Sequence, residues 1–174
     1  MSSDPQRDES EETLLVTPRF RVVNVPLTNQ PPKAIVRHPG SVCVLPIDER
    51  GRLCLIRNYR VSIAATLIEV PAGTLEPPES PEHCAVRELS EETGYQAQRW
   101  TKLGELFLAP GLLDECAHVF LAEGLSAGPQ ELQADEQIEN LLVEPGEIES
   151  MIRDGRIQDA KTLGTLSLWK VRCN

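Results

Sequence analysis

Three glutamates with helical spacing are the strongest chemical signal in this sequence. Glu91 and Glu92 lie three and four residues after Glu88, so an α-helix would place all three carboxylates on one side. Like charges at these spacings destabilise a helix by about 0.2–0.5 kcal/mol per pair. A divalent cation would relieve the repulsion, and carboxylate oxygens suit Mg²⁺ or Mn²⁺ better than zinc or copper. The alternative is a solvated acidic face, and these residues alone do not decide between the two.

The helix that must carry these glutamates has clear end signals. Ser80 is a typical N-cap, Pro81 suits the first helical position, and Glu82 places an acid in the first turn. Gly94 is typical of the residue just past a helix C-terminus. The sequence therefore predicts a helix over about 81–93. The glutamates would lie toward its C-terminal end, where the helix dipole disfavours negative charge.

The residues around the glutamates follow a longer fixed pattern. Gly73 is followed after five residues by Glu79, and after seven more by the run RELSEE at 87–92, with Gly94 two residues later. This spacing matches the Nudix box, G-x5-E-x7-R-E-U-x-E-E-x-G-U with U a bulky apolar residue, at every fixed position. Tyr95 is a mild departure at the last U. The chain thus resembles the Nudix hydrolases, which cleave nucleoside diphosphates linked to another moiety.

Neighbouring segments resemble one branch of that family, the ADP-ribose and nucleoside diphosphate sugar pyrophosphatases. Residues 68–73 read IEVPAG, similar to the branch's E-L-P-A-G, and residues 58–60 read NYR, similar to its Q-Y-R. Pro110 lies fifteen residues past the box, where a proline is associated with ADP-ribose preference. Ala109 and Leu67 stand where the branch often has Ser and Trp. The resemblance implies hydrolysis of ADP-ribose to AMP and ribose 5-phosphate, with other nucleoside diphosphate sugars as further substrates.

The resemblance also implies a Mg²⁺ site, in which Mn²⁺ can substitute. Its expected ligands are three carboxylates and one backbone carbonyl: Glu88, Glu91, Glu92 and Ala72. Gly73 would allow the backbone to approach the helix closely. The expected structural residues of the box are Gly73, Glu79, Arg87 and Gly94. Glu79 and Arg87 would form an ion pair, and the alternative is a pair between Arg87 and Glu91, four residues apart.

Hydrolysis of a diphosphate also needs a base that accepts a proton from water. In this branch the base is often a glutamate on a loop before a late strand, which by position is Glu136. Glu139 and Glu115 are competitors, and each has the alternative of being a surface carboxylate. The expected catalytic residues are therefore Glu136 and Glu92.

Four residues are candidates for substrate contacts: Arg60, Glu69, Phe20 and Pro110. Arg60 suits a phosphate or the terminal ribose, because a guanidinium matches phosphate oxygens. Glu69 would accept hydrogen bonds from the adenine edge or a ribose, and Phe20 would stack on the base. Each of these three has a structural alternative. Arg60 would then be a surface arginine, Glu69 a charge at a strand edge and Phe20 a core residue.

Composition limits the partners. The 174 residues are 40% hydrophobic and carry a net charge of −10, which argues against nucleic acid or an anionic membrane surface as the main partner. No run approaches ~18 apolar residues, and the first residues lack the pattern of a secretory signal. The five cysteines include no CxxC pair, and Cys43, Cys54 and Cys84 sit among apolar neighbours, which indicates buried thiols in a reducing compartment. We therefore expect a cytoplasmic protein with a small-molecule substrate.

The elements predicted around the site are those of an α/β chain. Strand-like segments are expected at 14–25, 41–47, 53–57, 67–70, 101–109, 117–125 and 141–143, with helices at 147–153 and 160–170 and a turn-rich break at 26–32. The resemblance implies the Nudix fold, a mixed sheet between helices. We expect an acidic tail at 1–12, N-terminal strands at 13–36 and a Nudix domain at 37–174. The resemblance also implies a homodimer whose N-terminal strands cross to the partner.

Two alternatives to this function remain. The first is a Nudix hydrolase with another substrate, such as a GDP-sugar, a dinucleotide polyphosphate or an oxidised nucleoside triphosphate. The second is a Nudix module that binds a nucleotide and regulates a partner without catalysis. The intact acidic cluster argues against the second, because a pure binder has no need of mutually repelling carboxylates.

Overall fold

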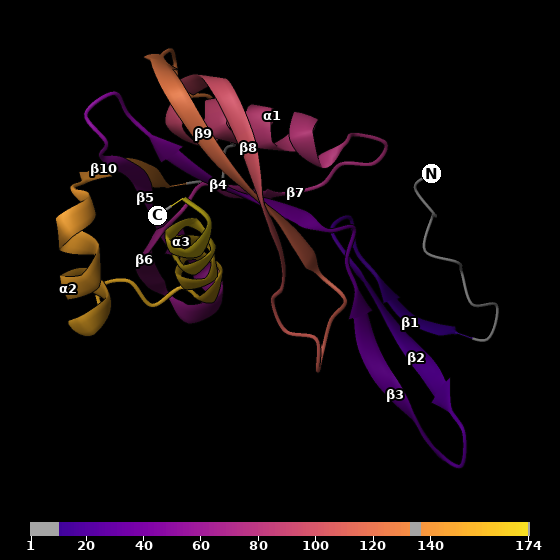
Figure 1. The fold of residues 1–174 in the computed structure, drawn as a ribbon. Helices are drawn as coiled ribbons and strands as arrows, with labels where there is room; N and C mark the ends of the chain where they lie inside the picture. The colour runs from indigo at the N-terminus through magenta and orange to yellow at the C-terminus, as the bar shows by residue number, and fades with distance from the viewer. Residues whose placement is uncertain (1–10, 133–136, 174) are drawn as a thin grey trace.

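The computed structural model describes residues 11–132 and 137–173, which form a mixed sheet with helices on both faces and a second, smaller sheet (Figure 1). The main sheet has the strand order β10 (Ile138–Val143), β5 (Leu53–Arg60), β4 (Ser41–Ile47), β9 (Cys116–Ala127), β8 (Tyr95–Phe107). Two short strands complete it, with β6 (Ala65–Glu69) paired to β5 and β7 (Ala72–Thr74) paired to β4. The central β4–β9 pair is parallel, and the other pairs are antiparallel.

Strand β4 is buried on both faces, and its alternating side chains divide the core in two. Val42 and Val44 pack with residues of α1 (Pro81–Thr93). Cys43 and Leu45 belong to the other cluster, with residues of α2 (Ile148–Arg153) and α3 (Ala160–Cys173). Helices therefore cover both faces of the sheet, and the predicted mixed sheet between helices is confirmed (Figure 1).

Helix α1 has the predicted bounds and end structures. The Ser80 hydroxyl accepts a hydrogen bond from the backbone N–H of His83, and Pro81 is the first helical residue. Gly94 follows the helix with φ of +73°, a conformation that strongly favours glycine. The box glutamates are thus held on a helix whose two ends are fixed.

The N-terminal segment forms its own three-stranded antiparallel sheet of β1 (Glu12–Val16), β2 (Arg21–Leu27) and β3 (Gln30–Arg37). The predicted turn-rich break at 26–32 is wrong, because only Thr28 and Asn29 separate β2 from β3. Pro31 and Pro32 lie within β3, which is an edge strand, where a missing backbone N–H costs little. Figure 1 shows this sheet projecting from the rest of the molecule.

The loop between β8 and β9 anchors the small sheet. The carbonyl of Leu112 accepts from the N–H of Val36 at 3.0 Å, and the Asp114 N–H donates back to the Val36 carbonyl at 3.2 Å. The Asp114 carboxylate accepts from the Arg37 guanidinium at 3.0 Å and from the His38 backbone N–H at 2.8 Å. These contacts fix β3 against the main body.

Strand β8 differs from the sequence prediction in extent. It begins at Tyr95, one residue after Gly94 ends α1 and six residues before the predicted start at Thr101. Short 3₁₀ turns, η1 (Val61–Ile63) and η2 (Pro145–Glu147), precede β6 and α2. Within the described part of the chain, no helix is long and apolar enough to cross a membrane.

Candidate active site

A cavity of about 1030 Å³ lies between the small sheet and the box segment. Its acidic wall comes from Glu88 and Glu92 of α1, next to Ala72 and Gly73 of β7. Its basic lining comes from the small sheet, from the connection that precedes β2, and from the end of β5: Arg19, Arg21, Arg37 and Arg60. One cavity thus brings together two of the three carboxylates expected to bind metal, Glu88 and Glu92, and four arginines suited to an anionic ligand; the described lining does not include Glu91.

The two carboxylates in the wall are buried. Glu88 is 6% exposed and Glu92 is 3% exposed, whereas the Glu91 side chain is 30% exposed. The backbone N–H of Ala72 donates to Oε2 of Glu92 at 2.9 Å. Strand β7, which pairs with β4, therefore holds its backbone directly against the helix that carries the glutamates.

Gly73 makes this approach possible. A Cβ atom built on Gly73 would lie 1.8 Å from both Cδ and Oε1 of Glu88. No real side chain tolerates such a contact, so any larger residue here must displace the Glu88 carboxylate. Glycine at this position is required by space rather than by an unusual backbone angle.

Arg87 connects the loop of the box to its helix. Its Nη2 atom donates to Oε1 of Glu79 at 2.7 Å and its Nε atom to Oε2 at 3.3 Å. Its Nη1 atom donates to Glu88 at 2.8 Å and to Glu91 at 3.2 Å. The expected pair with Glu79 and the alternative pair with Glu91 therefore both occur. The hydrogen bond from Arg87 lowers the pKa of Glu79 to about 2.

The donor set fits a hard divalent cation. The box places three carboxylates on α1: Glu88 and Glu91 share the Arg87 guanidinium with Glu79, and Glu92 accepts the Ala72 N–H. Two of them, Glu88 and Glu92, are buried in the cavity wall, and buried carboxylates need compensating positive charge. Clustered carboxylate oxygens are ligands that Mg²⁺ and Mn²⁺ prefer.

Glu69 lies behind Arg60 rather than in the cavity. Its side chain is 0% exposed, and its oxygens accept from Nε and Nη2 of Arg60 at 2.9 and 2.6 Å. Lys161 of α3 donates to the same carboxylate at 2.6 Å and to Asp159 at 2.8 Å. The hydrogen bond that Arg60 donates to Glu69 raises the pKa of Arg60 above its ordinary value. Arg60 therefore lines the cavity while its guanidinium is held from behind by Glu69, a buried carboxylate that also pairs with Lys161.

The remaining substrate candidates are placed differently. Phe20 lines the cavity beside the small sheet. Pro110 lies in the loop between β8 and β9, and the described lining does not include it. Sequence reasoning did not assign a site role to Arg19, Arg21 or Arg37. Their only sequence signal is positive charge recurring in and around strand-like segments.

The three candidates for the base are also separated. Glu136 lies outside the described residues. Glu115 accepts a hydrogen bond from the Ser41 hydroxyl at 2.7 Å, and Glu139 is exposed on β10; the described cavity lining includes neither. The Gln137 carbonyl accepts from the N–H of Tyr59, a lining residue, at 3.3 Å. Gln137, the first described residue after 136, thus contacts a lining residue through its backbone.

Comparisons with known proteins agree with this geometry. A NUDIX domain family model matches residues 37–165. An ADP-ribose pyrophosphatase of Bacillus subtilis (strain 168) is 39% identical over 142 residues, which are 80% of this chain and 77% of that protein. A methanol dehydrogenase activator of Bacillus methanolicus is 35% identical over 143 residues, 81% of this chain and 77% of that protein. A solved structure of an ADP compounds hydrolase superposes with a TM-score of 0.77 at 24% identity, covering 93% of this chain and 90% of that one.

Proposed function

The chain belongs to the Nudix family. We propose that, with bound Mg²⁺, it hydrolyses ADP-ribose, using one water molecule to give AMP and ribose 5-phosphate. The observation that carries the proposal is the single cavity lined both by box carboxylates and by arginines. A diphosphate between two sugars would pair directly with the arginines, and it would approach the box carboxylates through a divalent cation held between them. The similarity to an ADP-ribose pyrophosphatase supports this substrate.

We propose that the acidic wall, together with the neighbouring Glu91, holds the metal. Its proposed ligands are Glu88, Glu91, Glu92 and the backbone carbonyl of Ala72. The chemistry that bound Mg²⁺ supplies at such a site is neutralisation of diphosphate charge and acidification of a water molecule. The Ala72 N–H and the Arg87 guanidinium orient the carboxylates before any ligand arrives.

The basic lining has the task of positioning the substrate. Arg60 is proposed to bind a phosphate or the terminal ribose, and Phe20 to stack on the adenine. Glu69 acts through Arg60 by fixing the guanidinium from behind. Glu136 is proposed to accept the proton of the attacking water, so that the chain supplies positioning and proton transfer.

The small sheet is proposed to form a homodimer contact. All five residues of β1 are exposed, among them Leu14 at 50%, Leu15 at 52% and Val16 at 66%. Large apolar side chains clustered on an edge strand favour burial against another protein surface. A second copy of this chain would cover them. The five free thiols support a reducing, cytoplasmic location.

The test is a substrate panel on the full chain with Mg²⁺. ADP-ribose, GDP-mannose, diadenosine polyphosphate and an oxidised nucleoside triphosphate are compared by kcat/KM. Products are separated so that AMP and ribose 5-phosphate are identified. We expect ADP-ribose to give the highest kcat/KM. A higher value for the dinucleotide or the triphosphate would overturn the substrate assignment and leave the Nudix assignment intact.

The second candidate is a nucleotide-binding module without catalysis, favoured by the similarity to a methanol dehydrogenase activator. Isothermal titration with ADP-ribose in the presence of Mg²⁺ separates the two. Binding with no AMP formed over hours would support the module. Turnover that EDTA abolishes and Mg²⁺ restores would support the hydrolase.

A further inference from the structure

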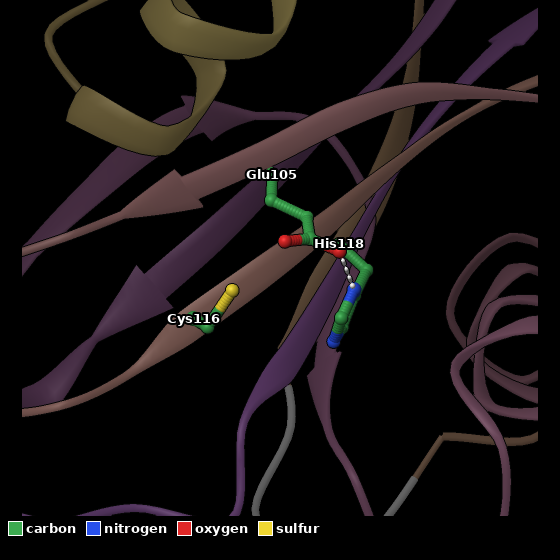
Figure 2. A group of neighbouring side chains, drawn as sticks. All are labelled: Glu105, Cys116 and His118. Atoms are coloured by element: carbon green, nitrogen blue, oxygen red, sulfur yellow. Dashed lines mark ion pairs between the residues drawn. The ribbon is translucent and has the colours of Figure 1, made fainter. Parts of the chain in front are cut away.

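We propose that Glu105, Cys116 and His118 form a second metal site, one that binds Zn²⁺ (Figure 2). The ligand atoms of these three side chains all lie within 4.8 Å of one another. None of the three belongs to the described lining of the active-site cavity. The site is therefore separate from the box glutamates.

Strand pairing brings the three side chains together. In the antiparallel β8–β9 pair, Glu105 lies opposite His118 and Phe107 lies opposite Cys116. Residues two apart on one strand share a face, and directly opposed residues are neighbours across the pair. Cys116, His118 and Glu105 thus lie on one face of two adjacent strands, and Figure 2 shows their side chains gathered there.

The geometry of the group suits a four-coordinate ion. Nδ1 of His118 lies 3.2 Å from Oε1 of Glu105, within ion-pair distance, yet this buried nitrogen makes no well-aligned hydrogen bond in the described part of the chain. Around a tetrahedral zinc ion with bonds of about 2.0–2.3 Å, neighbouring ligand atoms lie roughly 3.3–3.8 Å apart. Small side-chain rotations would bring all three atoms to these separations.

The donor types distinguish this site from the active site. A thiolate, an imidazole and one carboxylate favour zinc, whereas the box offers carboxylate oxygens alone. Glu105 also accepts a hydrogen bond from Lys102 at 2.7 Å, which orients the carboxylate as outer partners of metal ligands commonly do. Three protein ligands leave the fourth position to water.

The position of the site suggests its effect. Cys116 and Phe107 are the last pair of β8–β9 before the loop at 108–115, which carries Asp114. Asp114 in turn bonds Arg37 and His38, two residues that line the cavity. Bound zinc would cross-link the base of this loop and stabilise the folded chain.

The experiment titrates the full, chelator-treated chain with Co²⁺, which reports thiolate ligation by an absorption band in the near ultraviolet, and then displaces it with Zn²⁺. We expect one thiolate-bound cobalt per chain and a rise in melting temperature with zinc. The Cys116→Ser variant should lose the band, and His118→Gln should weaken cobalt binding at least about tenfold. Circular dichroism establishes that each variant is folded.

Two control variants make the outcome specific. Cys173→Ser removes an exposed thiol of α3 and should keep the band. Glu92→Gln alters the active-site carboxylates and should also keep it. A wild-type chain without the band, or a Cys116→Ser variant that retains it, would overturn the second site. Neither result bears on hydrolysis, because the readout is a spectrum of the protein without substrate.

Discussion

At the scale of single residues, Glu92 is the carboxylate that most directly tests the metal site. Its Oε2 accepts the Ala72 N–H, and the glutamine oxygen of Glu92→Gln can keep that bond while losing the charge. We expect kcat for ADP-ribose to fall by about two orders of magnitude or more, since an electrostatic element of the transition state is lost. Phosphate release with a coupled phosphatase measures it.

The matched control for this variant is Glu149→Gln, which removes an exposed charge of α2 paired with Lys170. Its kcat should equal that of the wild type. Without metal, Glu92→Gln should melt no lower than the wild type, because one of three crowded acids is removed. Unchanged kcat in Glu92→Gln would contradict the ligand assignment.

Glu79 links acid stability to the box. Its pKa falls from an ordinary 4.5 to about 2 through Arg87, so its stabilisation is full above pH 4.5 and is lost as the pH falls toward 2. Glu79→Gln should lower the free energy of unfolding at pH 7 by about 1–3 kcal/mol. The difference from the wild type should vanish near pH 2. Urea unfolding across this pH range measures it, and a constant difference at all pH values would contradict the ion-pair origin.

Arg60 tests recognition of the substrate. Losing a charged hydrogen bond costs about 1.5–3 kcal/mol, so Arg60→Ala should reduce kcat/KM for ADP-ribose about tenfold to a hundredfold. The loss should be smaller for a substrate without the contacted group. An equal loss for every substrate of the panel would mean that Arg60 supports the scaffold or the shared diphosphate.

Some of these site residues can be predicted from the sequence and others cannot. The box residues are identifiable because their spacing is fixed within one loop and one helix. The support of Arg60 is not, since Glu69 and Lys161 are 92 positions apart and nothing in a single sequence pairs them. The sequence does not predict the group of Glu105, Cys116 and His118 either, because Glu105 lies beside His118 only through the pairing of β8 with β9.

At the scale of elements, the contact between β7 and α1 depends on a missing side chain. Gly73→Ala would force its methyl group into the Glu88 carboxylate. We expect a folded protein whose kcat falls at least about tenfold, because a carboxylate is displaced from its orientation. Gly146→Ala is the control, as an added Cβ there meets nothing within 4 Å. Equal activity in both variants would contradict the role of the close approach.

Element prediction succeeded where local signals agree and failed where position in a sheet decides. Helix α1 has a cap, a proline and a terminal glycine that all indicate the same bounds. Strand β3 contains two adjacent prolines, which in the sequence indicate a break between strands. Only the structure shows that β3 is an edge strand, where prolines are tolerated. The start of β8 directly after Gly94 carries no separate strand signal.

At the scale of the whole molecule, the exposed β1 predicts assembly. Light scattering should report a mass near twice 19.3 kDa. Val16→Asp, on β1, should shift the mass toward the monomer, because it places charge on an apolar contact. Val171→Asp changes a valine of α3 that is exposed at least as much as Val16, and it should leave the mass unchanged. A Val16→Asp variant that keeps the wild-type mass would place the contact elsewhere.

Truncation is the stronger form of this test. Removing residues 1–36 deletes β1, β2 and most of β3, together with Arg19, Phe20 and Arg21 of the cavity lining. We expect a monomeric or insoluble chain that no longer binds ADP-ribose. A fully active monomer would refute both the dimer contact and the substrate role of the small sheet.

The cavity is assembled from two separately hydrogen-bonded sheets, and this division has a consequence for engineering. The cleaving half depends on buried packing among β4, β7 and α1, where most substitutions threaten the fold. The wall at residues 17–21 is formed by the connection between β1 and β2 and by the first residue of β2, and none of these five side chains is buried, so they can be exchanged at small cost in folding free energy. A library of variants confined to those five positions would therefore select for substrates that carry a different group in place of adenosine, while the cleaving half of the cavity stays unchanged.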